Sequence, residues 1–173
     1  MSTLSFASSF GHIKILLHTK NAPHTCQYFM QLAEQGDLDD ATLFRIVTNN
    51  GLQANAEPSI NIVQIGSADR LDGDRDLVPH ESTELTGIKH RRWTVSASRF
   101  GCGELYGSFF VCLEDEPQLD FGGKRNPDLM GFAAFGEVTE GFDTLTKLFS
   151  LAETSEFLSQ EIPMRYLAHP ESK

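Results

Sequence analysis

The chain has 173 residues, of which 40% are hydrophobic and 22% are charged, a composition typical of a globular protein rather than of a disordered or fibrous one. Asp and Glu number 24 and Lys and Arg number 14, so the formal net charge is −10. Because an acidic surface repels phosphates, we expect neither nucleic acid nor an anionic membrane as a partner. The length suits one domain, which we predict to span residues 1–173.

The location of the protein is inferred from features that the sequence lacks. No apolar run approaches the ~18 residues needed to cross a bilayer, and no basic segment followed by an apolar one marks a signal peptide. The three cysteines are too few, and odd in number, to make a disulfide framework. We therefore expect a cytoplasmic protein, while a periplasmic location stays open.

The first half of the chain begins with period-two alternation of hydrophobic residues, which marks strands with one buried face and predicts a hairpin over 4–18. An apolar stripe at helical spacing then predicts a helix that opens at Pro23 and ends at Gly36. Runs of β-branched and aromatic residues predict strands at 42–47 and 60–65, followed by a charged and mostly irregular segment.

The second half adds a helix whose apolar face begins at Phe142 and a short helix near Phe157. Four further strands are predicted, at 93–98, 107–113, 131–138 and 162–166. Since helices do not separate most of the strands, a doubly wound parallel sheet is disfavoured. We predict a mainly β fold, a closed eight-stranded antiparallel barrel capped by two α-helices, because closure removes exposed strand edges.

Two motifs that suggest a metal do not meet the chemical requirements of a metal site. The acidic run at 72–76 resembles the start of a calcium loop, but the sixth and twelfth positions hold Leu77 and Thr83 instead of glycine and glutamate. The cysteines and histidines lack the close pairing that a zinc site needs. We therefore expect no metal and no cofactor.

Three short segments contain the informative motifs. They are LFRIV at 43–47, IVQIG at 62–66 and GSFFV at 107–111. In this order and spacing, and with the segments around them, they resemble the cyclophilin family of peptidyl-prolyl isomerases over residues 4–167. Each motif alone is weak, but the set is specific.

The resemblance implies cis-trans isomerisation of X–Pro bonds, in proline-containing peptides or unfolded protein segments, by a monomer that needs no cofactor. By motif position, Arg45 and Gln64 are the catalytic residues, and Gln64 would hold the substrate backbone. An apolar pocket would hold the prolyl ring, with Ile62, Phe110, Leu119 and Phe132 as its walls. The complete set of expected substrate contacts is Phe44, Ile62, Ser98, Ser108, Phe110, Leu119 and Phe132.

The chemistry of X–Pro rotation explains why an arginine suits the catalytic position. The barrier of roughly 20 kcal/mol comes from amide resonance, in which the nitrogen lone pair is shared with the carbonyl. A donor aimed at that nitrogen stabilises the twisted state, where the lone pair is localised, more than the planar ground state. Arginine is always charged and holds its donors in a rigid fork.

Two departures from the family pattern favour an alternative function. Ile65 stands where the family has glycine and adds bulk near the expected groove, and Ser108 shortens one expected substrate contact. Both favour a catalytically weak module that binds proline-containing segments as a chaperone or scaffold. Taken alone, Arg45 fits a structural arginine paired with an acid equally well, and an unrelated acidic β-barrel that binds a small ligand is a further alternative.

Overall fold

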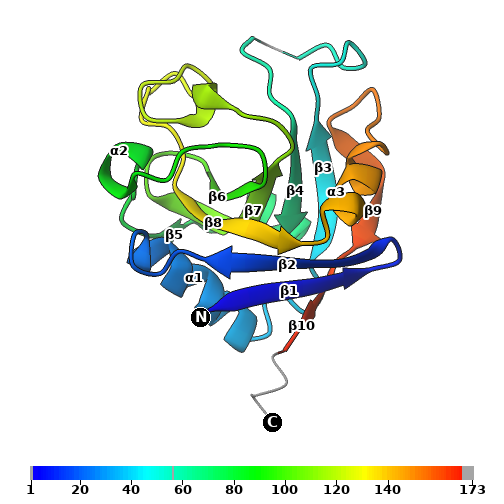
Figure 1. Ribbon diagram of the computed structural model, residues 1–173, viewed down its shortest axis with the longest axis horizontal. Helices are drawn as coiled ribbons and strands as arrows, with labels where there is room; N and C mark the ends of the chain where they lie inside the picture. Colours follow the sequence, from blue (N-terminus) through cyan, green and yellow to red (C-terminus); the bar gives the residue numbers. More distant parts are fainter. Residues whose placement is uncertain (1, 56, 169–173) are drawn as a thin grey trace.

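The computed structural model describes residues 2–55 and 57–168, which fold around one large antiparallel sheet (Figure 1). The sheet in these residues has ten strands: β1 (Thr3–Ser8), β2 (Gly11–Leu17), β3 (Thr42–Val47), β4 (Ile62–Gly66), β5 (Asp76–Leu77), β6 (Thr94–Arg99), β7 (Glu104–Cys112), β8 (Ala134–Glu140), β9 (Phe157–Pro163) and β10 (Arg165–Leu167). The helical segments are α1 (Pro23–Glu34), η1 (Ala68–Asp72), α2 (Thr83–Thr86), η2 (Pro117–Leu119) and α3 (Phe142–Phe149). Within the described ranges, no helix has the length and apolar composition needed to traverse a membrane.

The sheet closes through a single bent segment of the chain. Its strands follow the order β10-β1-β2-β8-β6-β7-β4-β3-β9, with β5 paired to β7 beside this path. The two ends of the order are consecutive in the sequence, because β9 pairs with β3, β10 pairs with β1, and Met164 alone separates them. Met164 is fully buried, and its N–H donates to the carbonyl of Ala41 at 2.8 Å. The predicted antiparallel barrel is thereby confirmed.

The strand count of eight is corrected to ten. The predicted closing strand is in fact two strands, β9 and β10, and β5 is a short strand inside the segment that we expected to be irregular. The short helix predicted near Phe157 is wrong, because this residue begins β9. Most side chains of β9 are exposed, so the sequence lacks a clear alternation of hydrophobic residues there. Hydrogen bonding to the edge of β3 makes this segment a strand.

The two long helices, α1 and α3, match the two predicted helices and lie well apart on the barrel (Figure 1). Each buries one apolar stripe in the main core. Cys26 and Phe29 of α1 and Leu145 and Leu148 of α3 are each at most 1% exposed. The helices therefore share a core with the sheet, and most of their stability comes from this packing rather than from helix propensity.

Strands β4 and β7 are buried on both faces, and successive residues point to different sides. Val63 and Ile65 of β4 and Phe109 of β7 belong to the main core. Ile62 and Phe110, one position away from these, belong to a separate apolar cluster on the outer face. This second cluster, formed with Val47, Ile60, Cys112 and Leu119, is the floor on which a binding site can form.

The long segment between β7 and β8 covers the outer cluster. The Phe132 N–H donates to the Leu119 carbonyl (3.0 Å), which folds the loop back on itself beside η2. A buried carboxylate anchors one end, because Glu116 accepts from the backbone and side-chain amides of Asn61 at 2.9 and 3.2 Å. The loop is therefore a fixed wall above the second cluster.

A carboxylate from a distant part of the chain caps the N-terminus of α1. The Glu81 carboxylate accepts from the backbone N–H of His24 (3.2 Å), and from the N–H and hydroxyl of Thr25 (2.8 and 2.6 Å). The first N–H groups of a helix have no partner within the helix, and the helix dipole favours negative charge there. Glu81 thus ties α1 to the segment that precedes α2.

We expect Glu81→Ala to lower the free energy of unfolding by about 2 kcal/mol, because buried donors lose a charged acceptor. Chemical denaturation measures the change. Glu84→Ala is the matched control, since it removes an exposed carboxylate three residues away and should cost no more than about 0.5 kcal/mol. Equal losses in the two variants would contradict the capping role.

Candidate functional site

Strand register brings three of the predicted site residues into one row. Arg45 of β3 pairs with Gln64 of β4, and Gln64 pairs with Phe110 of β7. A register shift between Leu43 and Arg45 leaves Phe44 as the extra residue of a bulge. Directly paired residues in an antiparallel sheet have side chains on the same face, so the row points outward toward the loop above it.

Gln64 is the centre of a buried hydrogen-bond network. Its side chain is almost fully buried, and its Oε1 accepts from Nη1 of Arg45 at 3.2 Å. Its Nε2 lies within hydrogen-bond distance of three hydroxyls: Ser98 Oγ (3.0 Å), Tyr106 OH (2.8 Å) and Ser108 Oγ (2.9 Å). An amide nitrogen has two hydrogens, so two of these hydroxyls accept at a time. The network holds the amide with its oxygen directed at Arg45.

The guanidinium of Arg45 is held by three groups. Glu156 Oε1 accepts from both Nε (3.1 Å) and Nη2 (2.6 Å), Gln64 accepts from Nη1, and the guanidinium carbon lies 5.4 Å from the ring centroid of Phe157. The Arg45 side chain is 24% exposed. It is therefore fixed in place, and an incoming ligand can still reach it.

A cavity of about 200 Å³ lies in front of this row. Its apolar walls come from the second cluster and the loop above it, and the rings of Phe110 and Phe132 meet edge to face with centroids 5.6 Å apart. The lining residues are Arg45, Ile60, Ile62, Gln64, Ser98, Arg99, Tyr106, Phe110, Leu119, Arg125, Asn126 and Phe132. A small pocket with an apolar wall beside an oriented guanidinium is suited to hold an aliphatic ring and donate to a polar atom next to it.

The comparisons with known proteins agree with this geometry. Residues 3–167 match the family model described as cyclophilin type peptidyl-prolyl cis-trans isomerase. The chain belongs to the cyclophilin family. It is 24% identical to the peptidyl-prolyl cis-trans isomerase cyp18 of Streptomyces antibioticus over 166 residues, which cover 95% of this chain and 93% of that protein. It is 22% identical to peptidyl-prolyl cis-trans isomerase B of Escherichia coli over 162 residues, 92% of each chain.

A solved cyclophilin has the same fold. The cyclophilin type peptidyl-prolyl cis-trans isomerase of Cryptosporidium parvum, crystallised in the presence of the dipeptide Ala-Pro, superposes with a TM-score of 0.71 at 18% identity. The match covers 97% of this chain and 99% of that one. The conservation of the fold at this low identity makes our chain a divergent cyclophilin.

Two of the expected substrate contacts do not line the cavity of this cyclophilin. Phe44 is 2% exposed and stacks on Phe157, with ring centroids 6.4 Å apart. Ser108 lies behind Gln64 as one of its hydroxyl partners. The expectation that Ile65 crowds the groove is also corrected, because this side chain lies in the main core. The structure brings the other predicted residues together around the cavity: Arg45, Ile62, Gln64, Ser98, Phe110, Leu119 and Phe132.

Several residues that line the cavity or hold Arg45 are not among those predicted from the sequence. Tyr106 could have been found, because it precedes Ser108 and Phe110 by two and four positions on one strand and so shares their face. No sequence pattern indicates Glu156, which lies 111 positions from Arg45 in the chain. Arg125 is likewise indicated by no pattern, since it lies in an irregular loop.

A buried histidine supports the pocket wall from behind. The His90 ring stacks on Phe110, with centroids 6.1 Å apart and planes 13° apart. Its Nδ1–H donates to Asp120 Oδ1 (2.8 Å), and its Nε2 accepts from the hydroxyl of Ser96 (2.8 Å). Burial lowers the pKa of His90, and the hydrogen bond and charge of Asp120 oppose this only in part. The imidazole is therefore neutral at pH 7.

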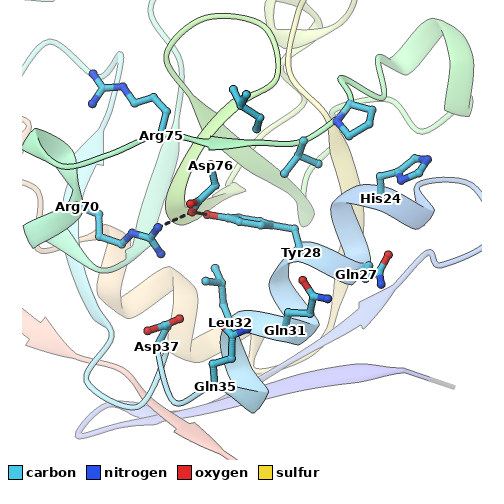
Figure 2. Close-up of a pocket in the computed structure, with 13 residues that line it drawn as sticks. His24, Gln27, Tyr28, Gln31, Leu32, Gln35, Asp37, Arg70, Arg75 and Asp76 are labelled. Carbon is cyan, nitrogen blue, oxygen red and sulfur yellow. Dashed lines mark hydrogen bonds and ion pairs between the residues drawn. The ribbon is translucent and has the colours of Figure 1, made fainter.

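A larger cavity of about 570 Å³ lies elsewhere, between α1 and the segment from η1 to Pro79 (Figure 2). In it the Tyr28 hydroxyl donates to Asp76 at 2.6 Å, and Arg70 forms an ion pair with the same carboxylate. Burial, followed by the contact with Asp76, raises the pKa of Tyr28. Asp76 thus already pairs with two donors of the protein, and none of the predicted site residues lines this cavity.

We expect the stability of the protein to fall as the pH is lowered from 7.5 to 5.5. The pKa of His90 is lower in the folded state than its unfolded value of about 6.5, so the unfolded chain binds the additional proton below that pH. The loss approaches about 1 kcal/mol over this interval. Urea denaturation of wild type and His90→Asn at both pH values measures it. An equal pH dependence in the two proteins would exclude His90 as the cause.

Proposed function

We propose that this cyclophilin catalyses cis-trans isomerisation of X–Pro bonds in flexible or unfolded protein segments and so assists protein folding. The observation that supports this most directly is the Arg45 guanidinium, oriented by Gln64 and Glu156 at the edge of a small pocket with an apolar wall. No nucleophile, metal or proton transfer is needed for rotation about an amide bond.

The proposed mechanism places the prolyl ring against Ile62, Phe110, Leu119 and Phe132. In the planar ground state the imide nitrogen shares its lone pair with the carbonyl and accepts a hydrogen bond poorly. As the bond twists, the lone pair localises, and a remaining N–H of Arg45 donates to it. Because this contact is stronger in the transition state than in the ground state, it lowers the barrier.

The role of Gln64 in this proposal is to position Arg45, in place of the substrate-backbone contact expected from the sequence. Its amide oxygen already accepts from the guanidinium, and its amide nitrogen is committed to the three hydroxyls around it. Donors held in place before the reaction need no reorganisation when charge develops. The Ala-Pro dipeptide present with the Cryptosporidium relative supports a proline-containing ligand for this pocket as well.

One observation favours the second candidate, a module that binds proline-containing segments with little catalysis. Glu156 takes two donor contacts from Arg45 and neutralises its charge. A guanidinium so paired attracts a localising lone pair less strongly. Ile65 and Ser108, the two departures from the family pattern, support this candidate less than the sequence suggested. Ile65 faces the main core, and the Ser108 hydroxyl is a hydrogen-bond partner of Gln64.

We expect Arg45→Ala to lower kcat/KM at least about tenfold, equivalent to ~1.4 kcal/mol of barrier. The measurement is NMR exchange on an Ala-Pro-Phe-type peptide. Stability should fall by no more than about 2 kcal/mol, because the Arg45–Glu156 pair is partly exposed and only the buried oxygen of Gln64 loses a donor. Arg91→Ala, which removes an exposed arginine outside the cavity, should leave the rate unchanged.

Three outcomes of this experiment are informative. An unchanged rate in Arg45→Ala would exclude the electrophilic role. A loss of rate that follows a large loss of stability would make Arg45 a structural residue. Binding of the peptide by well-folded wild type without acceleration would support the binding module instead.

We expect the catalysed rate to be nearly independent of pH from about 6 to 9, because arginine stays protonated throughout this range. Among the residues that the structure describes, no histidine, cysteine or lysine lines the cavity. His90 lies behind the wall and not among these residues, and burial lowers its pKa below the usual value. A bell-shaped dependence of kcat/KM on pH would indicate acid–base catalysis and contradict the mechanism.

A further inference from the structure

Three arginines line the small cavity, and they differ in how their charge is balanced. Arg45 pairs with Glu156, and Arg99 pairs with Asp128 at 2.9 Å. Arg125 makes no ion pair with any residue in the described part of the chain. A charged group held in a partly buried position without a counter-ion is unusual, because burial of charge is costly unless it is paired.

Arg125 is held in place by neutral groups. Its backbone N–H donates to the Gln118 carbonyl (3.1 Å), which fixes the loop, and its Nη1 donates to the Pro58 carbonyl (3.0 Å). The guanidinium is thus directed along the cavity wall, and it has further N–H groups for which the described residues provide no acceptor. An arginine fork with free donors is suited to bind a carboxylate through two hydrogen bonds.

The local electrostatics favour an anion at Arg125. Burial lowers the pKa of Arg125, and the positive charge of Arg45 lowers it further, while Glu156 and Glu116 offset part of this effect. Both carboxylates already have partners, since Glu156 binds Arg45 and Glu116 binds Asn61. A negative group brought by a ligand would relieve the repulsion between the two arginines.

We propose that Arg125 is a specificity-determining residue that selects X–Pro segments with an acidic side chain next to the proline. The inference rests on the proposed function and names its substrate class. Arg125 and the apolar residues proposed to hold the prolyl ring line one small cavity of about 200 Å³, and consecutive Cα atoms are only about 3.8 Å apart. A prolyl ring in the apolar part therefore brings the side chain of a neighbouring residue within reach of Arg125.

The test uses capped peptides in which the side chain at one varied position, Xaa, is the only one that can carry a charge. They are acetyl-Ala-Xaa-Pro-Phe-amide and acetyl-Ala-Phe-Pro-Xaa-amide, with Xaa as Glu, Gln or Lys. Exchange spectroscopy gives kcat/KM for each, and the quantity compared is the ratio of Glu to Gln within one protein. Differences in overall rate between variants cancel in this ratio. Acetyl and amide caps exclude the peptide termini as the source of a carboxylate.

For wild type we expect a ratio of about fivefold in favour of Glu at one of the two positions, which corresponds to about 1 kcal/mol. Arg125→Gln should reduce it to about one, and Arg125→Glu should make Lys the preferred residue. Arg125→Lys keeps the charge but loses the fork, and it should retain part of the preference. Lys124→Gln is the matched control, because it removes the same charge from the exposed neighbouring side chain and should leave the ratio unchanged.

A ratio near one in wild type at both positions would overturn the inference. So would a preference that survives in Arg125→Gln, since Arg45 and Arg99 would then account for it. Chemical-shift titration of the same peptides gives the ratio of Kd values, so the preference is measurable even where no acceleration occurs. If neutral peptides are accelerated but no preference for Glu appears, the proposed isomerase activity stands and only the role of Arg125 is excluded. Peptides that neither bind nor exchange faster exclude both.

Discussion

The hydrogen-bonded register of β3, β4 and β7 is the constraint on which the site depends. It places Arg45 beside Gln64 and Gln64 beside Phe110, and a shift of one residue would turn all three toward the core. The register itself is fixed by burial. Val63, Ile65 and Phe109 must face the main core, and their neighbours must then face outward. Packing of the core thus orders the functional row on the opposite face.

The buried amide of Gln64 connects the barrel to the site. An amide in an apolar sheet is stable only when its groups find partners, and here the hydroxyls of three residues and one guanidinium supply them. These partners come from β3, β6 and β7, so the amide joins strands on both sides of β4. Because the strands hold this amide in one orientation, its oxygen in turn holds the guanidinium of Arg45 in one orientation.

The three arginines of the cavity differ in whether a carboxylate pairs with them, although the chain as a whole has a net charge of −10. Glu156 and Asp128 each neutralise one arginine, while Arg125 has no counter-ion in the part of the chain that the structure describes. The cavity therefore contains one region where a guanidinium has no directly paired carboxylate among the described residues. Such a region is suited to attract a segment of opposite charge and to discriminate between neutral and acidic neighbours of a proline.

The sequence by itself determined the class of fold and the main members of the site. Alternation in β1 and β2, the apolar stripes of the two long helices and the Arg, Gln and Phe-Phe motifs are local patterns, and local periodicity follows from the geometry of strands and helices. Motif order was enough to predict that Arg45, Gln64 and Phe110 belong together, and strand pairing joins them directly.

Tertiary structure decided what depends on contacts between distant segments. The strand state of β9 follows from its pairing with β3, because its own side chains are mostly exposed and leave no clear pattern. The same holds for Glu156 on Arg45 and for the position of Arg125 in the wall, since both reach the site from irregular segments. Even the side that Ile65 faces was set by the register of β4. Side chains that meet across the fold have no periodic relation in the sequence, and only the folded chain brings them together.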